Sequence, residues 1–125
     1  MKAIVDSAIF MDAPTMSGQH YMHNYLTNSI KLTNVDAPLP AAECVNAHPG
    51  DQAKCYFAEN LYMHVQVPLF AACSLYDSFA IPGILGVGCI NGVSLQNCNS
   101  AQRNHIEQYH HNISTLLNQI GARSG

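Results

Sequence analysis

An unbroken run of hydrophobic positions occupies residues 69–73, with the sequence LFAAC. Pro68 precedes the run, and the first position of a strand tolerates proline because that position can do without a ladder N–H. A short apolar run between turn-prone residues is typical of a strand buried on both faces, as in a parallel sheet covered by helices. We therefore predict a central strand in this segment.

The spacing of apolar positions predicts further elements before this strand. Residues 2–10 are strand-like and end in an acid-rich turn with Asp6 and Asp12. Ser17 can cap a helix that continues to about Leu32, because the apolar residues between them recur near helical spacing. Residues 57–65 predict a short helix with its apolar side chains on one side.

The segments between these elements have the composition of loops. Residues 34–40 contain proline and are expected to form a linker, and residues 41–54 are expected to form a loop between two cysteines. Residues 78–95 are expected to be irregular, because four glycines interrupt any regular pattern.

The best-defined element is a helix at the end of the chain. Asn99 is suited to its N-cap, and Gln102 three residues later completes a pair that resembles a capping box. Gly121 is expected to be the C-cap. The helix carries an apolar stripe at a period of 3.6 residues, formed by Ile106, Tyr109, Ile113, Leu116, Leu117 and Ile120.

The order strand, helix, helix, strand, helix predicts an α/β fold in which helices flank a parallel sheet. We expect one incomplete domain over residues 1–125, because the chain stops where another strand is expected. The apolar faces of the strand at residues 2–10 and of the last helix are then expected to be partly bare, which favours aggregation.

Composition narrows the classes of partner. Hydrophobic residues make up 48% of the chain, charged residues 10%, and the net charge is -3, so the chain is too apolar to be disordered. It has no basic cluster, and we do not expect nucleic acid as a partner. No apolar run approaches the roughly 20 residues of a membrane span. No secretory signal is present, and since Met1 leads directly into a strand, we expect that Met1 is not the natural start.

The chain has five cysteines, and four of them flank polar loops. Cys44 and Cys55 enclose one loop, and Cys89 and Cys98 enclose another, an arrangement that suits disulfides in an oxidising compartment. The alternative is five reduced thiols. Cys73 lies in the apolar run and is expected to be a buried free thiol. Neither pair has the C-x-x-C spacing of a zinc site.

The remaining motifs are weaker. His20 and His23 are three residues apart, but no E-x-x-H pattern or nearby acid completes a site with them, and the adjacent His110 and His111 point in different directions on a helix. We therefore expect no metal site and no cofactor. Asn112 begins an N-glycosylation sequon, which matters only in a secreted protein. No serine has the flanking glycines of a nucleophile elbow, and no phosphate-binding loop is present.

Asp77 follows the central strand by a few residues. Chemistry in open α/β sheets gathers at the carboxyl ends of strands, so this carboxylate is a candidate for orienting a catalytic histidine. The other interpretation is that Asp77 only caps the turn after the strand.

Several stretches resemble a known family, and in chain order they are DSAIFMD at residues 6–12, the cysteine at 44 with KCYF at 54–57, PLF at 68–70 with YDSF at 76–79, and the cysteine at 89 with CNSAQ at 98–102. They resemble the segments D-[AS]-G-[FW]-F-L-D, C…K-C-F-F, P-L-F…Y-D-S-W and C…C-N-S-x-Q of the pectin acetylesterase/Notum carboxylesterases, a branch of the α/β-hydrolases. The resemblance covers nearly the whole chain in the right order.

The resemblance implies roles for individual residues. Asp77 matches the acid of the catalytic triad, which orients the imidazole of a histidine. The paired cysteines of the family imply the disulfides Cys44–Cys55 and Cys89–Cys98. The positions that line the acyl pocket in the family are matched by Phe10, Tyr56, Phe57 and Phe79.

Four positions depart from the family pattern. Ala8 replaces a glycine, Tyr56 and Phe79 replace other aromatic residues, and Cys73 lies where the family often has a polar residue. These departures bear on the choice of substrate more than on the fold.

In the family, the nucleophilic serine and the oxyanion hole precede this region and the triad histidine follows it. His105, His110 and His111 lie in the helix before that histidine and do not match it. The resemblance thus implies part of a secreted serine carboxylesterase that removes acyl groups, such as acetyl from a polysaccharide like pectin. It also implies that this chain is inactive alone. The alternatives are a non-catalytic homologue with a structural or binding role, and a disulfide-stapled interaction module unrelated to hydrolases.

Overall fold

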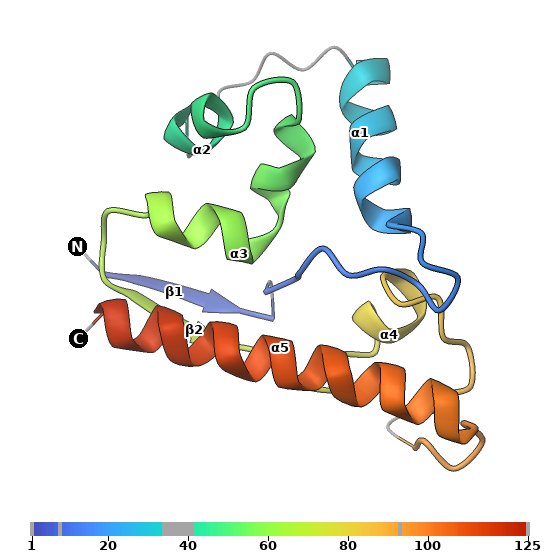
Figure 1. Cartoon of the computed structure of the whole chain (residues 1–125). Coiled ribbons are helices and arrows are strands. Elements are labelled where there is room, and N and C mark those ends of the chain that lie inside the picture. The colour runs from blue at the N-terminus through green and yellow to red at the C-terminus, as the bar shows by residue number, and fades with distance from the viewer. Residues whose placement is uncertain (1, 8, 34–41, 93, 125) are drawn as a thin grey trace.

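The computed structural model describes residues 2–7, 9–33, 42–92 and 94–124 (Figure 1). The elements in chain order are β1 (Ala3–Asp6), α1 (Tyr21–Thr33), α2 (Ala42–Ala47), η1 (Gln52–Tyr56), α3 (Ala58–Leu61), η2 (Tyr62–His64), β2 (Leu69–Ala72), α4 (Ala80–Gly83) and α5 (Ser100–Ser124), where η denotes a 3-10 helix. A two-stranded parallel sheet with flanking helices confirms the predicted α/β class at this level.

The sheet pairs β1 with β2 in parallel, from Ala3 opposite Leu69 to Asp6 opposite Ala72. The strand predicted over residues 2–10 is therefore only four residues long. It ends because Ser7 has a φ of 57°, in the left-handed region that extended chains avoid. The N–H of Ser7 still donates to the carbonyl of Ala72, at 2.8 Å, and closes the ladder.

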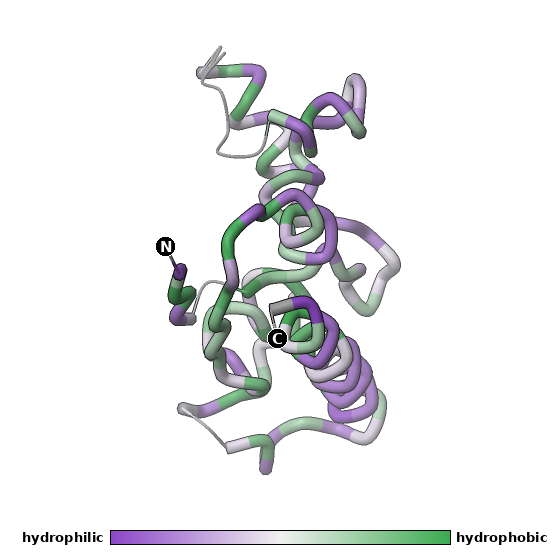
Figure 2. Tube along the Cα trace, turned by 90° about the vertical axis from the view of Figure 1, so that its left-hand side faces the viewer, coloured by the Kyte–Doolittle hydropathy of each residue, from purple (hydrophilic) through white to green (hydrophobic). Residues whose placement is uncertain are grey.

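The prediction that the central strand is buried on both faces is wrong. Burial alternates along β2, and Phe70 is 67% exposed. Its partner in the register, Ile4, is 77% exposed on the same face of the sheet. The reason is that α5 packs against β2 from one side, while no described element covers the other face. In Figure 2, β1 lies at the margin of the molecule.

The hydrophobic core lies between α5, α4 and the segment after α4. All but one of the predicted stripe residues on α5 are between 1% and 4% exposed, and Leu117 is partly buried beside them. The stripe is thus confirmed as core, and the expectation that it would be partly bare is wrong. It packs against Ile81, Ile84, Leu85 and Val87, which belong to the segment predicted to be irregular.

The N-terminus of α5 has the predicted capping box. The N–H of Asn99 donates to Oε1 of Gln102, and the N–H of Gln102 donates to Oδ1 of Asn99, both at 2.9 Å. The predicted C-cap is wrong, because α5 continues through Gly121 to Ser124. Gly121 does not have the positive φ of a helix-terminating glycine.

The loop predicted between the first two cysteines is largely helical, since α2 and η1 occupy it. Both expected disulfides are present: Cys44–Cys55, with Cα atoms 5.9 Å apart, and Cys89–Cys98, with Cα atoms 5.0 Å apart. Cys73 is free, as predicted, but only partly buried.

The helix α1 begins at Tyr21 rather than after Ser17. Ser17 instead shares a hydrogen bond with the hydroxyl of Thr15, at 2.9 Å, and the N–H of Gln19 donates to the same Thr15 oxygen. The helix predicted over residues 57–65 is divided into α3 and η2. The linker predicted at residues 34–40 lies outside the described residues.

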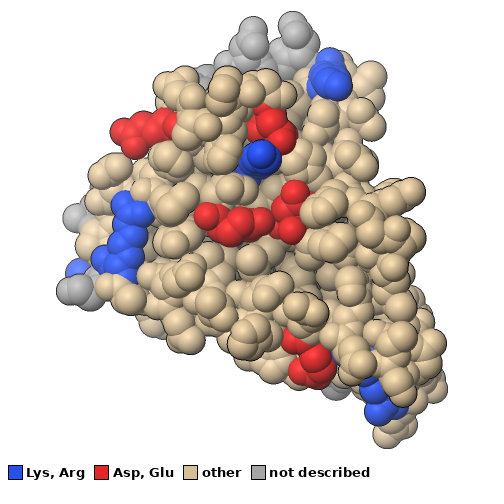
Figure 3. Space-filling view, in the orientation of Figure 1, with Lys and Arg blue, Asp and Glu red and all other residues tan. Residues whose placement is uncertain are grey.

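Charged side chains are sparse on the face shown in Figure 3. Among the described residues, no helix combines the length and hydropathy that a membrane span needs.

Candidate functional site

Asp77 lies in the turn between β2 and α4, beyond the carboxyl end of β2. Its Oδ1 accepts the backbone N–H groups of Phe79, at 2.9 Å, and Ala80, at 2.7 Å. This is N-cap geometry, since the side-chain oxygen satisfies the second and third N–H groups of a helical turn. Asp77 therefore caps this turn, and its role toward a catalytic histidine stays a prediction.

The cap occupies one oxygen of the carboxylate. Within the described residues, Oδ2 of Asp77 accepts no hydrogen bond, and no histidine nitrogen bonds to either oxygen. The side chain therefore has one oxygen fixed by the backbone and one oxygen free to accept. This arrangement is compatible with orienting an imidazole that comes from elsewhere.

Tyr76, the residue before Asp77, connects this turn to α5 by hydrogen bonds. The hydroxyl of Tyr76 donates to the Glu107 carboxylate at 2.9 Å and lies 2.8 Å from Nδ1 of His110. The rings of Tyr76 and His110 meet edge to face, with centroids 4.7 Å apart. The hydrogen bond to Glu107 raises the pKa of Tyr76, so its hydroxyl keeps its proton. His110, which the sequence did not favour as the triad histidine, thus bonds to Tyr76.

Two further groups respond to the charge of Asp77. Burial raises the pKa of the Cys73 thiol, and the Asp77 carboxylate adds to this shift. Burial also raises the pKa of Tyr109 to about 12, and its hydroxyl oxygen accepts the N–H of Met11 at 3.3 Å. Both groups are therefore neutral near pH 7, and Cys73 is a poor nucleophile there.

The aromatic residues expected around the acyl group are only partly brought together. Phe10 and Phe79 are in ring contact, with centroids 5.4 Å apart, and Phe79 is exposed. Phe57 is fully buried and stacks against His23 rather than lining an open pocket. Tyr56 is exposed on η1.

Asn112, the first residue of the predicted glycosylation sequon, is exposed on α5. The structure thus leaves its side chain accessible, and its modification remains a prediction.

The sequence did not reveal a cluster of histidines and carboxylates around α1. His20 and His23 both bond to Asp12, and His23 also bonds to Asp51. Local spacing could not find this cluster, because Asp12 and Asp51 are 8 to 28 residues from the histidines they bond to. Among the described residues, no group of three or more potential ligands converges on a metal position.

Asp77 does not line the cavity beside α1. A cavity of about 490 Å³ lies between α1 and the disulfide loop and is lined by residues such as Lys31, Val45, His48 and Asp51. We define the candidate site by the Asp77 turn and the Phe10–Phe79 contact.

Comparisons with known proteins bear on the family of the chain. The family model described as Pectinacetylesterase matches residues 1–125. Among curated proteins, Pectin acetylesterase 11 of Arabidopsis thaliana is 22% identical over 125 residues, which cover 94% of this chain and 31% of that protein. The chain thus spans about a third of the length of this relative. No solved structure matches the chain.

Proposed function

Because the chain belongs to the pectinacetylesterase family, we propose that it forms part of a serine carboxylesterase with an α/β-hydrolase fold and supplies the acid of its catalytic triad. The observation that carries this proposal is the carboxylate of Asp77, which follows a parallel strand and keeps one oxygen free. The serine, the oxyanion hole and the histidine would come from parts of the full-length protein outside residues 1–125.

The role of Asp77 follows from its two oxygens. The N–H groups of Phe79 and Ala80 hold Oδ1, which fixes the plane of the carboxylate. Oδ2 would accept a hydrogen bond from the Nδ1–H of the triad histidine, which leaves Nε2 unprotonated and able to take the proton of the attacking serine. The carboxylate would then stabilise the imidazolium while the acyl-enzyme forms.

The substrate class proposed is an acetylated polysaccharide such as pectin. The Phe10–Phe79 contact lies beside the Asp77 turn and would provide an apolar surface for a small acyl group, with Tyr56 and Phe57 as further predicted pocket residues. Serine-dependent acyl transfer needs only side chains and water, so we propose no metal or cofactor.

We also propose that the protein is secreted. Both disulfides close short loops, as expected in an oxidising compartment, and Asn112 is exposed for glycosylation. Mass spectrometry of the protein from its native source would reveal the glycan and the oxidised cysteines.

The test is Asp77→Asn in the full-length protein that contains this segment. Asparagine retains an oxygen for the cap but not the charge, so the fold should persist while kcat for an acetyl ester falls by about 10⁴-fold. Glu43→Gln, the same kind of change at an exposed site on α2, should leave kcat unchanged. Near-normal turnover by folded Asp77→Asn would remove Asp77 from the mechanism. An inactive parent protein would instead favour the non-catalytic homologue.

A further inference from the structure

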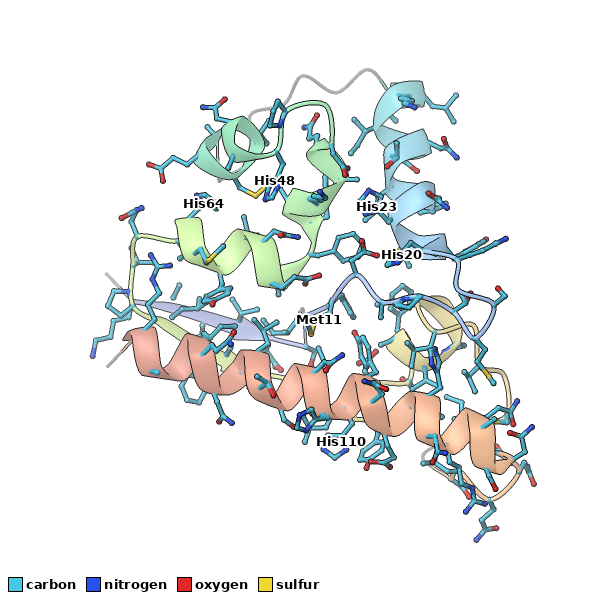
Figure 4. The ribbon with its side chains drawn as sticks, viewed as in Figure 1. Met11, His20, His23, His48, His64 and His110 are labelled. Atoms are coloured by element: carbon cyan, nitrogen blue, oxygen red, sulfur yellow. A yellow bond between two sulfur atoms is a disulfide. The ribbon has the colours of Figure 1, made fainter. Side chains whose placement is uncertain are left out.

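The imidazole of His23 lies between two carboxylates that are far apart in the sequence. Its Nδ1 is 2.8 Å from Oδ2 of Asp12, and its Nε2 is 2.9 Å from Oδ1 of Asp51. The His23 side chain is only 16% exposed. Figure 4 shows it projecting from α1 toward the middle of the molecule.

The two contacts together require a proton on each ring nitrogen of His23. An ionised carboxylate only accepts hydrogen bonds, so each ring nitrogen must donate, whereas a neutral imidazole carries a single N–H. We propose that His23 is a proton-dependent clamp, which holds α1 to the segment after β1 through Asp12 and to the disulfide loop through Asp51. When His23 loses its proton, one of the two contacts must open, because a nitrogen lone pair then faces a carboxylate oxygen.

Other charged or titratable groups surround the clamp. His20 lies 2.7 Å from the second oxygen of Asp12, and Lys54 lies 3.6 Å from the second oxygen of Asp51. Oε1 of Glu59 accepts the N–H of Asp12 at 2.8 Å. One face of the imidazole stacks on the Phe57 ring, with the ring centroids 5.8 Å apart and an angle of 19° between the ring planes. The carboxylates of Asp12 and Asp51 are thus the groups in direct contact with the ring nitrogens.

The balance of these effects favours the charged form. Burial by itself lowers the pKa of His23, but the hydrogen bonds and charges of Asp12 and Asp51 outweigh burial and raise the pKa above the usual 6.5. A histidine with a raised pKa in the folded state stabilises fully below the unfolded value of 6.5. This stabilisation is lost as the pH rises through the folded-state pKa.

The helix α1 also packs against η1 and, through Met22, against the core. None of the described side chains of α1 is fully buried. Asp51 also lines the cavity of about 490 Å³ between α1 and the disulfide loop. Opening the contact between His23 and Asp51 would therefore allow α1, which forms one wall of this cavity, to move away from the disulfide loop, which forms the other. This proposal does not depend on ester hydrolysis.

The direct test is an NMR titration of the chain, with the imidazole nitrogens labelled with nitrogen-15. We expect His23 to carry protons on both nitrogens at pH 6 and to titrate above 6.5. The protection of α1 amides against hydrogen exchange, corrected for intrinsic rates, should fall over the same pH range. If His23 titrates at or below 6.5, or carries a single N–H while α1 stays protected, the clamp is excluded.

Variants separate the clamp from its neighbours. His23→Gln can donate to only one carboxylate and has no ionisable group, so the pH-dependent loss of α1 protection should disappear. His20→Gln is the matched control, because His20 lies on the same helix and binds the other oxygen of Asp12, and it should retain that loss. Asp51→Asn should lower the pKa of His23. The opposite pattern, with pH dependence lost in His20→Gln and kept in His23→Gln, would assign the effect to His20.

Discussion

At the scale of single residues, the surroundings of a side chain decide what chemistry it can perform. Asp77 satisfies the N–H groups of a helical turn with one oxygen, and the same cap leaves its other oxygen free for an imidazole. The cap and the proposed triad acid are therefore compatible roles of one carboxylate. Cys73 lies a few residues away, and its raised pKa keeps it protonated.

The state of Cys73 gives a prediction at this scale. Because burial and the charge of Asp77 disfavour the thiolate, iodoacetamide should modify Cys73 more slowly in the folded chain than in the unfolded chain at the same pH. Peptide mapping without reduction should recover Cys44–Cys55 and Cys89–Cys98. A disulfide that contains Cys73 would contradict the assignment.

At the scale of elements, α5 shows which sequence signals determine a helix and which do not. Its apolar stripe and its capping box are local, and both are observed as predicted. The glycine at residue 121 is not sufficient to end the helix. One glycine costs a helix only about 1 kcal/mol, and α5 continues past it.

The prediction for α5 is that Gly121→Ala stabilises the chain. A Cβ at residue 121 meets no atom within 4 Å, and alanine loses less backbone entropy, so the free energy of unfolding should rise by about 0.5–1 kcal/mol. Urea denaturation measures this change.

Gly50→Ala is the matched control for this substitution. A Cβ there also meets no atom within 4 Å, but Gly50 has a φ of +81°, so alanine should destabilise by about 1–2 kcal/mol. Equal effects of the two substitutions would show that α5 does not continue through Gly121.

At the scale of the whole molecule, the described residues cover only one face of the sheet. Ile4 and Phe70 lie opposite each other in the register and are both largely exposed. Exposed apolar patches of this kind favour association. The core around α5 is closed at the same time, and Ile4 and Phe70 form an adjacent pair of exposed apolar side chains on the sheet.

We therefore predict that the chain of 125 residues self-associates through this face. Replacing Ile4 and Phe70 together by threonine, which keeps a high strand propensity, should lower the average mass in sedimentation experiments. Leu32→Thr removes a leucine that is 86% exposed on α1, away from the sheet, and should leave the average mass unchanged. An equal effect of Leu32→Thr would show that association is not specific to the sheet.

The chain made alone should hydrolyse a chromogenic acetyl ester no faster than buffer. Ser74 and Ser78 are near Asp77 in the sequence, but no described histidine is hydrogen-bonded to either serine, so their hydroxyls stay weak nucleophiles. Activity that disappears in Asp77→Ala would mean that the chain carries its own nucleophile, and our assignment of the triad would then be wrong.

The sequence by itself determined the features that depend on neighbours along the chain. The stripe and the capping box of α5, and the pairing of Cys44 with Cys55 and of Cys89 with Cys98, involve residues at short, fixed separations. In each case, periodicity or spacing in the sequence corresponds directly to proximity in space.

Only the tertiary structure decided the features that depend on what covers a surface or which distant groups meet. The exposure of Phe70 depends on how many layers pack against the sheet, which the apolar run cannot encode. The contacts of His23 with Asp12 and Asp51 join three segments whose separations follow no helical or strand period. Their protonation follows from that meeting, because desolvation and nearby charge act through space rather than along the chain.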